Sequence, residues 1–333
     1  MEKITATGII SSVMETIDDI HLTGGVRAYL TDGGWSLFPV RDGNTTGSLH
    51  PMQLGQLKDF VQKFGLRVFG GDAITNPKSV LPTRIWTPLP KPTEGRRQPA
   101  DEWGAIAHAA DRAGDEKASR LAAHISFSLR AAGIRLRDAS DQYHKQLLIA
   151  LGNGTEIGTR FSNIPLADLY LAFHSLLSEM GSARDYLAAE LARRVGAPEK
   201  VDSLARFADW VSDPSRASIA AQPAIAAMLE AYSKSSADPW LYHLTDYRNL
   251  FLHREPIGSN RFAQLLRLGE RATDGLKIPV IELYIHAGPK SKDKCEALDR
   301  FVDLHQRLLT LATLVVDTSA YRATPPHIMV VEK

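Results

Sequence analysis

The segment from residue 166 to residue 191 repeats apolar side chains at helical spacing with almost no interruption. Pro165 suits the first turn of a helix, and Gly196 and Pro198 end it. A short surface helix cannot bury a stripe of this length, so the segment has to lie among other helices. The sequence therefore predicts a helical bundle with this helix at its centre. The stripe consists of Leu166, Leu169, Tyr170, Phe173, Leu176, Leu177, Met180, Leu187 and Leu191.

Helical spacing also marks much of the chain on either side of this stripe. We expect residues from about 101 to 318 to form one helical bundle in which the 166–191 helix is the longest. Residues 280–285 are an exception, because their apolar and β-branched composition allows a strand. The tail at 328–331 is expected to pair with that strand or with the N-terminal part of the chain. The other helical segments are 103–151, 201–211, 219–232, 240–253 and 292–317.

The first hundred residues have a different pattern. Residues 26–30 and 35–40 are strand-like and flank Thr31-Asp32-Gly33-Gly34, which supplies the positive φ of a tight hairpin turn. A helix is expected at 52–64 and a short strand at 66–69, whereas residues 9–20 fit a helix or a strand equally well.

Prolines then crowd residues 77–99, where they disfavour both a helix and a central strand. We therefore predict a small α+β domain at residues 1–75, a proline-rich linker or extended arm at 76–100, and a helical bundle with a strand-like tail at 101–333. The predicted fold class is mainly α.

Composition narrows the classes of protein to which the chain can belong. Its 333 residues favour two globular domains. A single cysteine, Cys295, allows no intrachain disulfide and no cysteine-based zinc site, and we expect neither a metal nor another cofactor. No apolar run is long enough to cross a bilayer and no secretory leader follows Met1, so a cytoplasmic location is expected. The net charge of +1 argues against a protein that coats nucleic acid without specificity.

One stretch concentrates groups suited to phosphate chemistry: Asp246-Tyr247-Arg248-Asn249-Leu250-Phe251-Leu252-His253-Arg254. An arginine, an amide and a histidine lie close together near the end of a predicted helix. Arginine binds phosphate through a planar fork of donors and keeps its charge, and histidine exchanges a proton near neutral pH. These two side chains are the minimum for metal-free cleavage of an RNA phosphodiester.

The spacing Arg248-Asn249-x-x-x-His253, in a bundle that also contains Ser182-Ala183-Arg184-Asp185-Tyr186-Leu187-Ala188, resembles the HEPN superfamily. The resemblance covers roughly residues 120–318 and implies a metal-independent endoribonuclease that acts as a toxin or defence effector. Arg248 would bind the scissile phosphate and His253 would act as general acid or base. Asn249 would orient His253 or hydrogen-bond the phosphate. Attack by the ribose 2′-hydroxyl would leave a 2′,3′-cyclic phosphate.

Helix geometry limits what one copy of this motif can do. Asn249 and His253 are four residues apart and share a helix face. Arg248 is five residues from His253, roughly 140° around the axis, so one helix does not aim both side chains at one atom. The resemblance implies that a second copy completes the site across a two-fold axis. The expected partners are therefore RNA, a second copy of the chain, and an antitoxin or other regulatory partner.

Two other classes stay open. A catalytically inactive HEPN module would bind RNA, a nucleotide or a protein partner. In a purely structural helical scaffold, Arg248 would pair with Asp246, Glu255 or Asp185, and His253 would be favoured at the helix C-terminus by the macrodipole. An Arg248 that is buried with a carboxylate partner would favour the scaffold. His243 is a weaker candidate for the site, and four histidines at apolar helix faces are interpreted as structural: His108, His124, His174 and His305.

Overall fold

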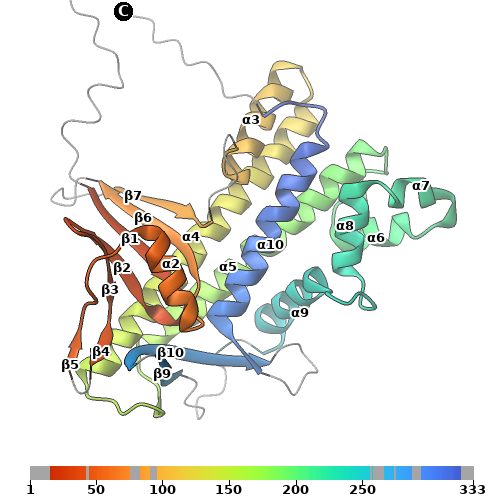
Figure 1. Ribbon diagram of the computed structural model, residues 1–333. Helices are drawn as coiled ribbons and strands as arrows, with labels where there is room; N and C mark the ends of the chain where they lie inside the picture. The colour runs from red at the N-terminus through yellow and green to blue at the C-terminus, as the bar shows by residue number, and fades with distance from the viewer. Residues whose placement is uncertain are drawn as a thin grey trace, which may run out of the picture.

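The computed structural model describes residues 16–42, 45–75, 83–90, 96–255, 257, 266–273, 275–286 and 294–323. In these residues, two antiparallel sheets lie beside a set of long helices (Figure 1). The expectation of a mainly α fold is therefore wrong, because the described residues form an α+β fold. Several of the strands that the sequence did not reveal are only two or three residues long.

The first sheet has five strands in the order β3-β2-β1-β6-β7, and each neighbouring pair is antiparallel. β2 and β3 form the hairpin that was predicted around Thr31-Asp32-Gly33-Gly34, where Gly34 has a φ of 122°. The part of segment 9–20 that the structure describes begins β1. The strand predicted at 66–69 begins at Val68 and runs on as β6. The strands are β1 (Thr16–Leu22), β2 (Arg27–Thr31), β3 (Gly34–Phe38), β6 (Val68–Thr75) and β7 (Thr83–Pro88).

Strand β7 lies in the proline-rich segment for which a linker or extended arm was predicted. Its threonine, isoleucine and tryptophan side chains favour extended backbone, and it occupies a sheet edge, where proline is tolerated. Between β5 and β6, α2 (Leu54–Lys63) confirms the helix predicted at 52–64. A 3₁₀ turn, η1 (Thr23–Gly25), joins β1 to β2.

The second sheet combines strands from both ends of the chain. Its order is β5-β4-β10-β9-β8, with β11 also paired to β10. Arg41 of β4 pairs with Lys277 of β10, so the early strands are completed by late ones. The strand expected at 280–285 lies within β10, and the predicted strand-like tail at 328–331 lies outside the described residues. The strands are β4 (Val40–Asp42), β5 (Thr45–Gly47), β8 (Arg160–Phe161), β9 (Leu266–Thr273), β10 (Leu276–His286) and β11 (Lys294–Glu296).

The helix predicted from the 166–191 stripe is confirmed as α5, which has 29 residues. The expectation that it is the longest helix is wrong, because α4 has 37. A left-handed glycine, Gly114, separates α3 from α4. The helices are α3 (Pro99–Arg112), α4 (Glu116–Gly152), α5 (Leu166–Arg194), α6 (Leu204–Val211), η2 (Pro214–Arg216), α7 (Ala217–Ala220), α8 (Pro223–Tyr232), α9 (Trp240–His253) and α10 (Ala297–Asp317).

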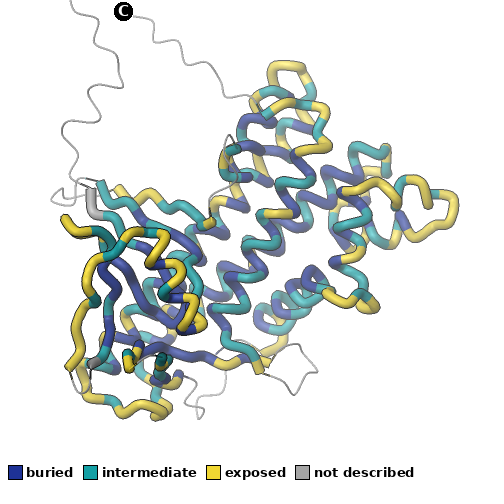
Figure 2. The backbone as a smooth tube through the Cα atoms, in the orientation of Figure 1, coloured by how far each residue is buried: buried dark blue, intermediate teal, exposed yellow. Residues whose placement is uncertain are grey.

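One apolar core joins the sheets to the helices. Leu22 of β1, Leu177 of α5 and Phe301 of α10 all belong to it and have no exposed surface. Figure 2 shows buried backbone along the facing sides of the long helices and on into the sheets. The division into domains at residues 75 and 100 stays a prediction. The apolar core continues across both positions, and β4 of the first part pairs with β10 of the last. In the described residues, no helix has the length and apolar character needed to span a membrane.

Candidate functional site

Helix α9 carries the Arg248-Asn249-x-x-x-His253 motif and packs one face against the core. The buried residues on that face are Trp240, Leu241, Leu244, Tyr247 and Phe251. Their spacing follows the helical period, so the motif residues are left on the other sides of the helix. The helix ends at His253, where the backbone N–H of Arg254 donates to the carbonyl of Leu250.

Arg248 lies half-buried between α9 and α5. A Cβ at Gly181 of α5 would come within 2.8 Å of Arg248 Cδ, so the absence of a side chain there lets the arginine pack against the helix. Arg248 Nη1 donates to Asn249 Oδ1 at 3.4 Å, which is a long hydrogen bond. Arg248 Nε is buried and has no hydrogen-bond partner in the described part of the chain. Packing against α5 therefore fixes the position of the guanidinium, whereas its hydrogen-bonding capacity is poorly satisfied within the described residues.

The carboxylates considered as partners of Arg248 do not neutralise it. Asp185 is bound by its neighbour Arg184, through contacts of 3.1 Å to Nε and 2.9 Å to Nη2. Asp246 and Glu255 form no ion pair with Arg248 in the described residues. Arg184, in turn, is buried and donates from Nη1 to Thr245 Oγ1 at 2.6 Å, which ties α5 to α9. Arg184 is thus a structural residue, whereas no carboxylate of the described residues pairs with Arg248.

His253 and Asn249 lie away from the Arg248 packing site. His253 is exposed at the end of α9, and Asn249 is half-buried. No hydrogen bond joins Arg248 to His253 in the described structure, as the helix geometry predicted. A single chain thus positions the three residues on one helix without bringing the arginine and the histidine to one point.

No family model matches the chain, and comparisons with curated proteins and with solved structures found no match. The resemblance to the HEPN superfamily therefore rests on the residues of α5 and α9 alone.

Three other histidines have surroundings that favour a structural role. His174 of α5 accepts a hydrogen bond from the backbone N–H of Ile257 at 3.2 Å, and burial lowers its pKa. Burial and the charge of Arg300 lower the pKa of His243. His305 of α10 is 1% exposed, and burial lowers its pKa to about 4. In all three, burial disfavours the charged form of the imidazole, which is typical of a structural histidine.

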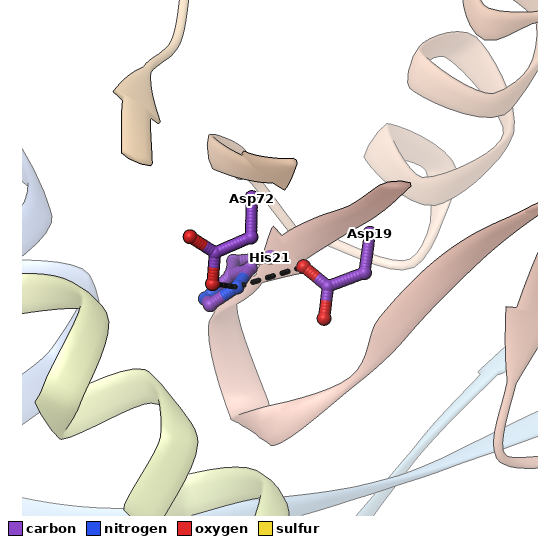
Figure 3. Close-up of side chains that lie close together, drawn as sticks. All are labelled: Asp19, His21 and Asp72. Atoms are coloured by element: carbon purple, nitrogen blue, oxygen red, sulfur yellow. Dashed lines mark ion pairs between the residues drawn. The ribbon is translucent and has the colours of Figure 1, made fainter. Parts of the chain in front are cut away.

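The fold also gathers a polar cluster that the sequence analysis did not identify (Figure 3). Asp19 and His21 alternate along β1 and so point to the same face of the first sheet. Asp72 of β6 stands opposite Asp19, and Arg27 of β2 stands opposite His21. A register of this kind cannot be read from one sequence, although the run Asp18-Asp19-Ile20-His21 was a visible signal.

Ion pairs connect this cluster to β7 and α4. His21 Nε2 lies 3.0 Å from Asp19 Oδ1 and 3.4 Å from Asp72 Oδ2, and its Nδ1 is 3.1 Å from Ser140 Oγ. Arg27 donates to Asp19 at 2.8 Å and to Asp141 of α4 at 2.6 Å. Arg84 of β7 donates to Asp72 and, at 2.8 Å, to Asp141. Three carboxylates, two guanidiniums and one imidazole thus form a single network, which is buried at His21, Arg27 and Asp72 and reaches the surface at Arg84 and Asp141.

The carboxylates of this network are held in their charged form. Burial opposes the ionisation of Asp141, but the hydrogen bond from Arg84 and the charge of Arg27 outweigh it and lower its pKa to about 2. Burial acts in the same sense on Asp19 and Asp72, and both have a lowered pKa because their contacts with His21 and with an arginine prevail. The network is therefore an arrangement in which paired charges compensate for lost hydration.

Asp19, His21 and Asp72 offer three ligand atoms within 4.8 Å of one another, which is a spacing that suits a metal ion. However, Arg27 Nη1 lies 2.5 Å from His21 Nε2, close to where an ion bound to that nitrogen would sit. A cation there would also meet the charges of both arginines. The cluster as placed fits a structural ion network better than a metal centre.

Proposed function

We propose that the chain is a metal-independent endoribonuclease whose site is built from Arg248, Asn249 and His253. The observation that carries the proposal is the guanidinium of Arg248, which is half-buried and has no carboxylate partner in the described residues. Holding an arginine in this state costs stability unless an anion compensates it, and a phosphate diester is an anion that matches its fork of donors.

The two side chains would divide the reaction as follows. Arg248 would bind the scissile phosphate and stabilise the charge that develops on its oxygens. His253 would take the proton from the ribose 2′-hydroxyl or give a proton to the leaving 5′-oxygen, and its exposure on the described surface allows it to exchange protons with water. Asn249 shares the His253 face and would orient the imidazole or donate to the phosphate. The products are a 2′,3′-cyclic phosphate and a 5′-hydroxyl.

The same geometry favours a site made by two copies of the chain. Arg248 faces α5, whereas His253 is at the exposed end of α9, so one chain does not converge them on one phosphate. A two-fold contact through α9 would bring each arginine near the partner's histidine. The proposal thus includes a homodimer, RNA as substrate and the cytoplasm as the site of action. A toxin or defence role, with an antitoxin or regulatory partner, would fit such an activity.

The experiment is cleavage of single-stranded RNA in excess EDTA, with the product ends identified. His253→Ala and Arg248→Ala should each lower the rate by on the order of a hundred-fold or more, the usual effect of removing a general acid–base group or an oxyanion donor. His108→Ala on α3 and Arg206→Ala on α6 are matched controls, because both residues are exposed and lie outside the motif. Circular dichroism should show all four variants folded.

Mixing the two inactive variants tests the composite site. An Arg248→Ala chain supplies His253 and a His253→Ala chain supplies Arg248, so a mixed dimer should recover part of the parent activity. Recovery that is absent, in a mixture shown to exchange subunits, would contradict the two-chain site. RNA binding without cleavage would favour an inactive binding module, and parent-like cleavage by both variants would place the activity elsewhere.

A further inference from the structure

A cavity of about 270 Å³ opens between β7 and α4, far along the chain from the α9 motif. The N-terminal end of α3 and Leu309 of α10 complete its wall. Much of the lining is apolar, and Ile85 of β7 is 52% exposed there. Such a concave, partly apolar space with a few polar groups is the usual form of a small-molecule site. The larger apolar residues of the lining are Ile85, Trp86, Pro88, Leu129, Ile134 and Leu309.

Two glycines hold Trp86 in this wall. A Cβ at Gly70 of β6 would lie 1.9 Å from the Trp86 ring, and one at Gly133 of α4 would lie 3.3 Å from it. The ring also packs edge-on against His21, with centroids 4.7 Å apart. Trp86 Nε1 is buried and has no hydrogen-bond partner in the described residues. The indole is thus fixed in place as a rigid apolar surface.

The charged part of the lining is predominantly positive. Arg84, Arg130 and Arg137 line the cavity, and Asp101 is the single carboxylate residue among the described lining residues. Asp101 pairs with Arg130, and both side chains are largely exposed. The partners of Arg84 and Arg137 are Asp72, Asp141 and Asp138, which stand outside the lining. The wall therefore combines an aromatic surface with cationic donors that keep part of their hydrogen-bonding capacity.

We propose that this cavity binds a small organic anion that has an aromatic or short alkyl body and one carboxylate. The body would pack on Trp86 and Leu129, and the carboxylate would accept hydrogen bonds from Arg130 and Arg137. A neutral molecule of the same shape would offer these two guanidiniums no charged acceptor and would bind more weakly. This site is independent of the α9 motif, so it stands whether or not the chain cleaves RNA.

The test is isothermal titration calorimetry of the full chain with 1-naphthoate and with its neutral counterpart, 1-naphthamide. Naphthoate should bind one per chain and at least tenfold more tightly than naphthamide, since hydrogen bonds from a guanidinium to a charged acceptor are worth that much or more. Arg137→Gln should weaken naphthoate about tenfold. Ile134→Trp should abolish binding of both compounds, because the larger side chain would occupy the cavity.

Arg135→Gln is the matched control, because Arg135 is on the same helix and pairs with the same Asp138 but does not line the cavity. It should change the affinity less than twofold. If Arg137→Gln does not fold, Arg130→Gln replaces it, since that side chain is 59% exposed. Equal affinity for the two compounds, equal losses in Arg135→Gln and the cavity arginine variant, or no binding at millimolar naphthoate would each overturn the proposal.

Discussion

Asp141→Asn tests whether the ion network between the first sheet and α4 stabilises the fold through charge. Asp141 on α4 accepts from Arg27 of β2 at 2.6 Å and from Arg84 of β7 at 2.8 Å, so it links the first sheet to the longest helix. Asparagine has nearly the same shape but cannot carry the negative charge. The variant should therefore lose the electrostatic contribution of the residue and keep its packing.

The size of the effect follows from the pKa. The folded pKa of about 2 lies below the ordinary value of 3.8, because the contacts with Arg84 and Arg27 prevail over burial. At about 1.4 kcal/mol per tenfold change, the charge contributes about 2 kcal/mol to the free energy of unfolding at pH 7. A lowered carboxyl pKa stabilises the protein above the unfolded value, and the contribution disappears as pH falls through the folded value. About half of it should remain at pH 3.

Urea unfolding of the parent and of Asp141→Asn at pH 7, 4 and 3 measures this contribution. Asp101→Asn is the control, because Asp101 forms an ion pair with Arg130 in which both side chains are largely exposed, and such pairs contribute about 0–1 kcal/mol. The difference between parent and Asp141→Asn should shrink as the pH falls. A difference that is the same at pH 7 and pH 3, or no larger than that of the control, would refute the electrostatic account.

Three further changes test other parts of the fold. Gly70→Ala should lower the free energy of unfolding, measured with urea, by about 1–3 kcal/mol, because its Cβ would meet the Trp86 ring. Gly55 on α2 faces open space, so Gly55→Ala should be neutral or stabilising by up to about 1 kcal/mol in the same measurement. Burial lowers the pKa of His305 in the folded protein to about 4, so between pH 6.5 and 4 only the unfolded chain gains a proton at this histidine. The parent should therefore lose about 3 kcal/mol of stability over that range. His305→Leu should flatten this pH dependence. Leu177→Ala should cost about 2–5 kcal/mol by leaving a cavity beside α5, and a thermal melt at fixed pH that shows no shift would contradict this.

An element was predictable from the sequence where its pattern lies within neighbouring residues. The apolar stripe of α5 and the Gly33-Gly34 hairpin are examples, because helical period and positive φ are properties of neighbouring residues. The longest helix was misjudged because the apolar face of α4 is rich in alanine and serine, such as Ala132 and Ser140, which give a weak hydrophobic period. Strand β7 was hidden by the prolines around it.

Long-range pairings were not predictable for a different reason. The partner of Arg41 is Lys277, and no local feature of β4 points to β10. The Asp19–His21–Asp72 cluster likewise depends on the register of β1 with β6, which is fixed by tertiary packing. For the α9 motif, the sequence predicted the helix correctly. It did not predict that Gly181 would receive Arg248 or that Asp185 would be taken by Arg184.

The pairing of β4 with β10 sets an order for how the protein can be made. A ribosome releases β4 and β5 early, but their sheet partner is synthesised only after α9 has emerged. During that interval the edge of β4 presents unpaired backbone groups, which are a template for association with other chains. The first sheet and α2 can form meanwhile, because all of their residues lie between residues 16 and 88. Completion of the second sheet must therefore be a late step in synthesis, and chains cut short before residue 276 would keep an open strand edge.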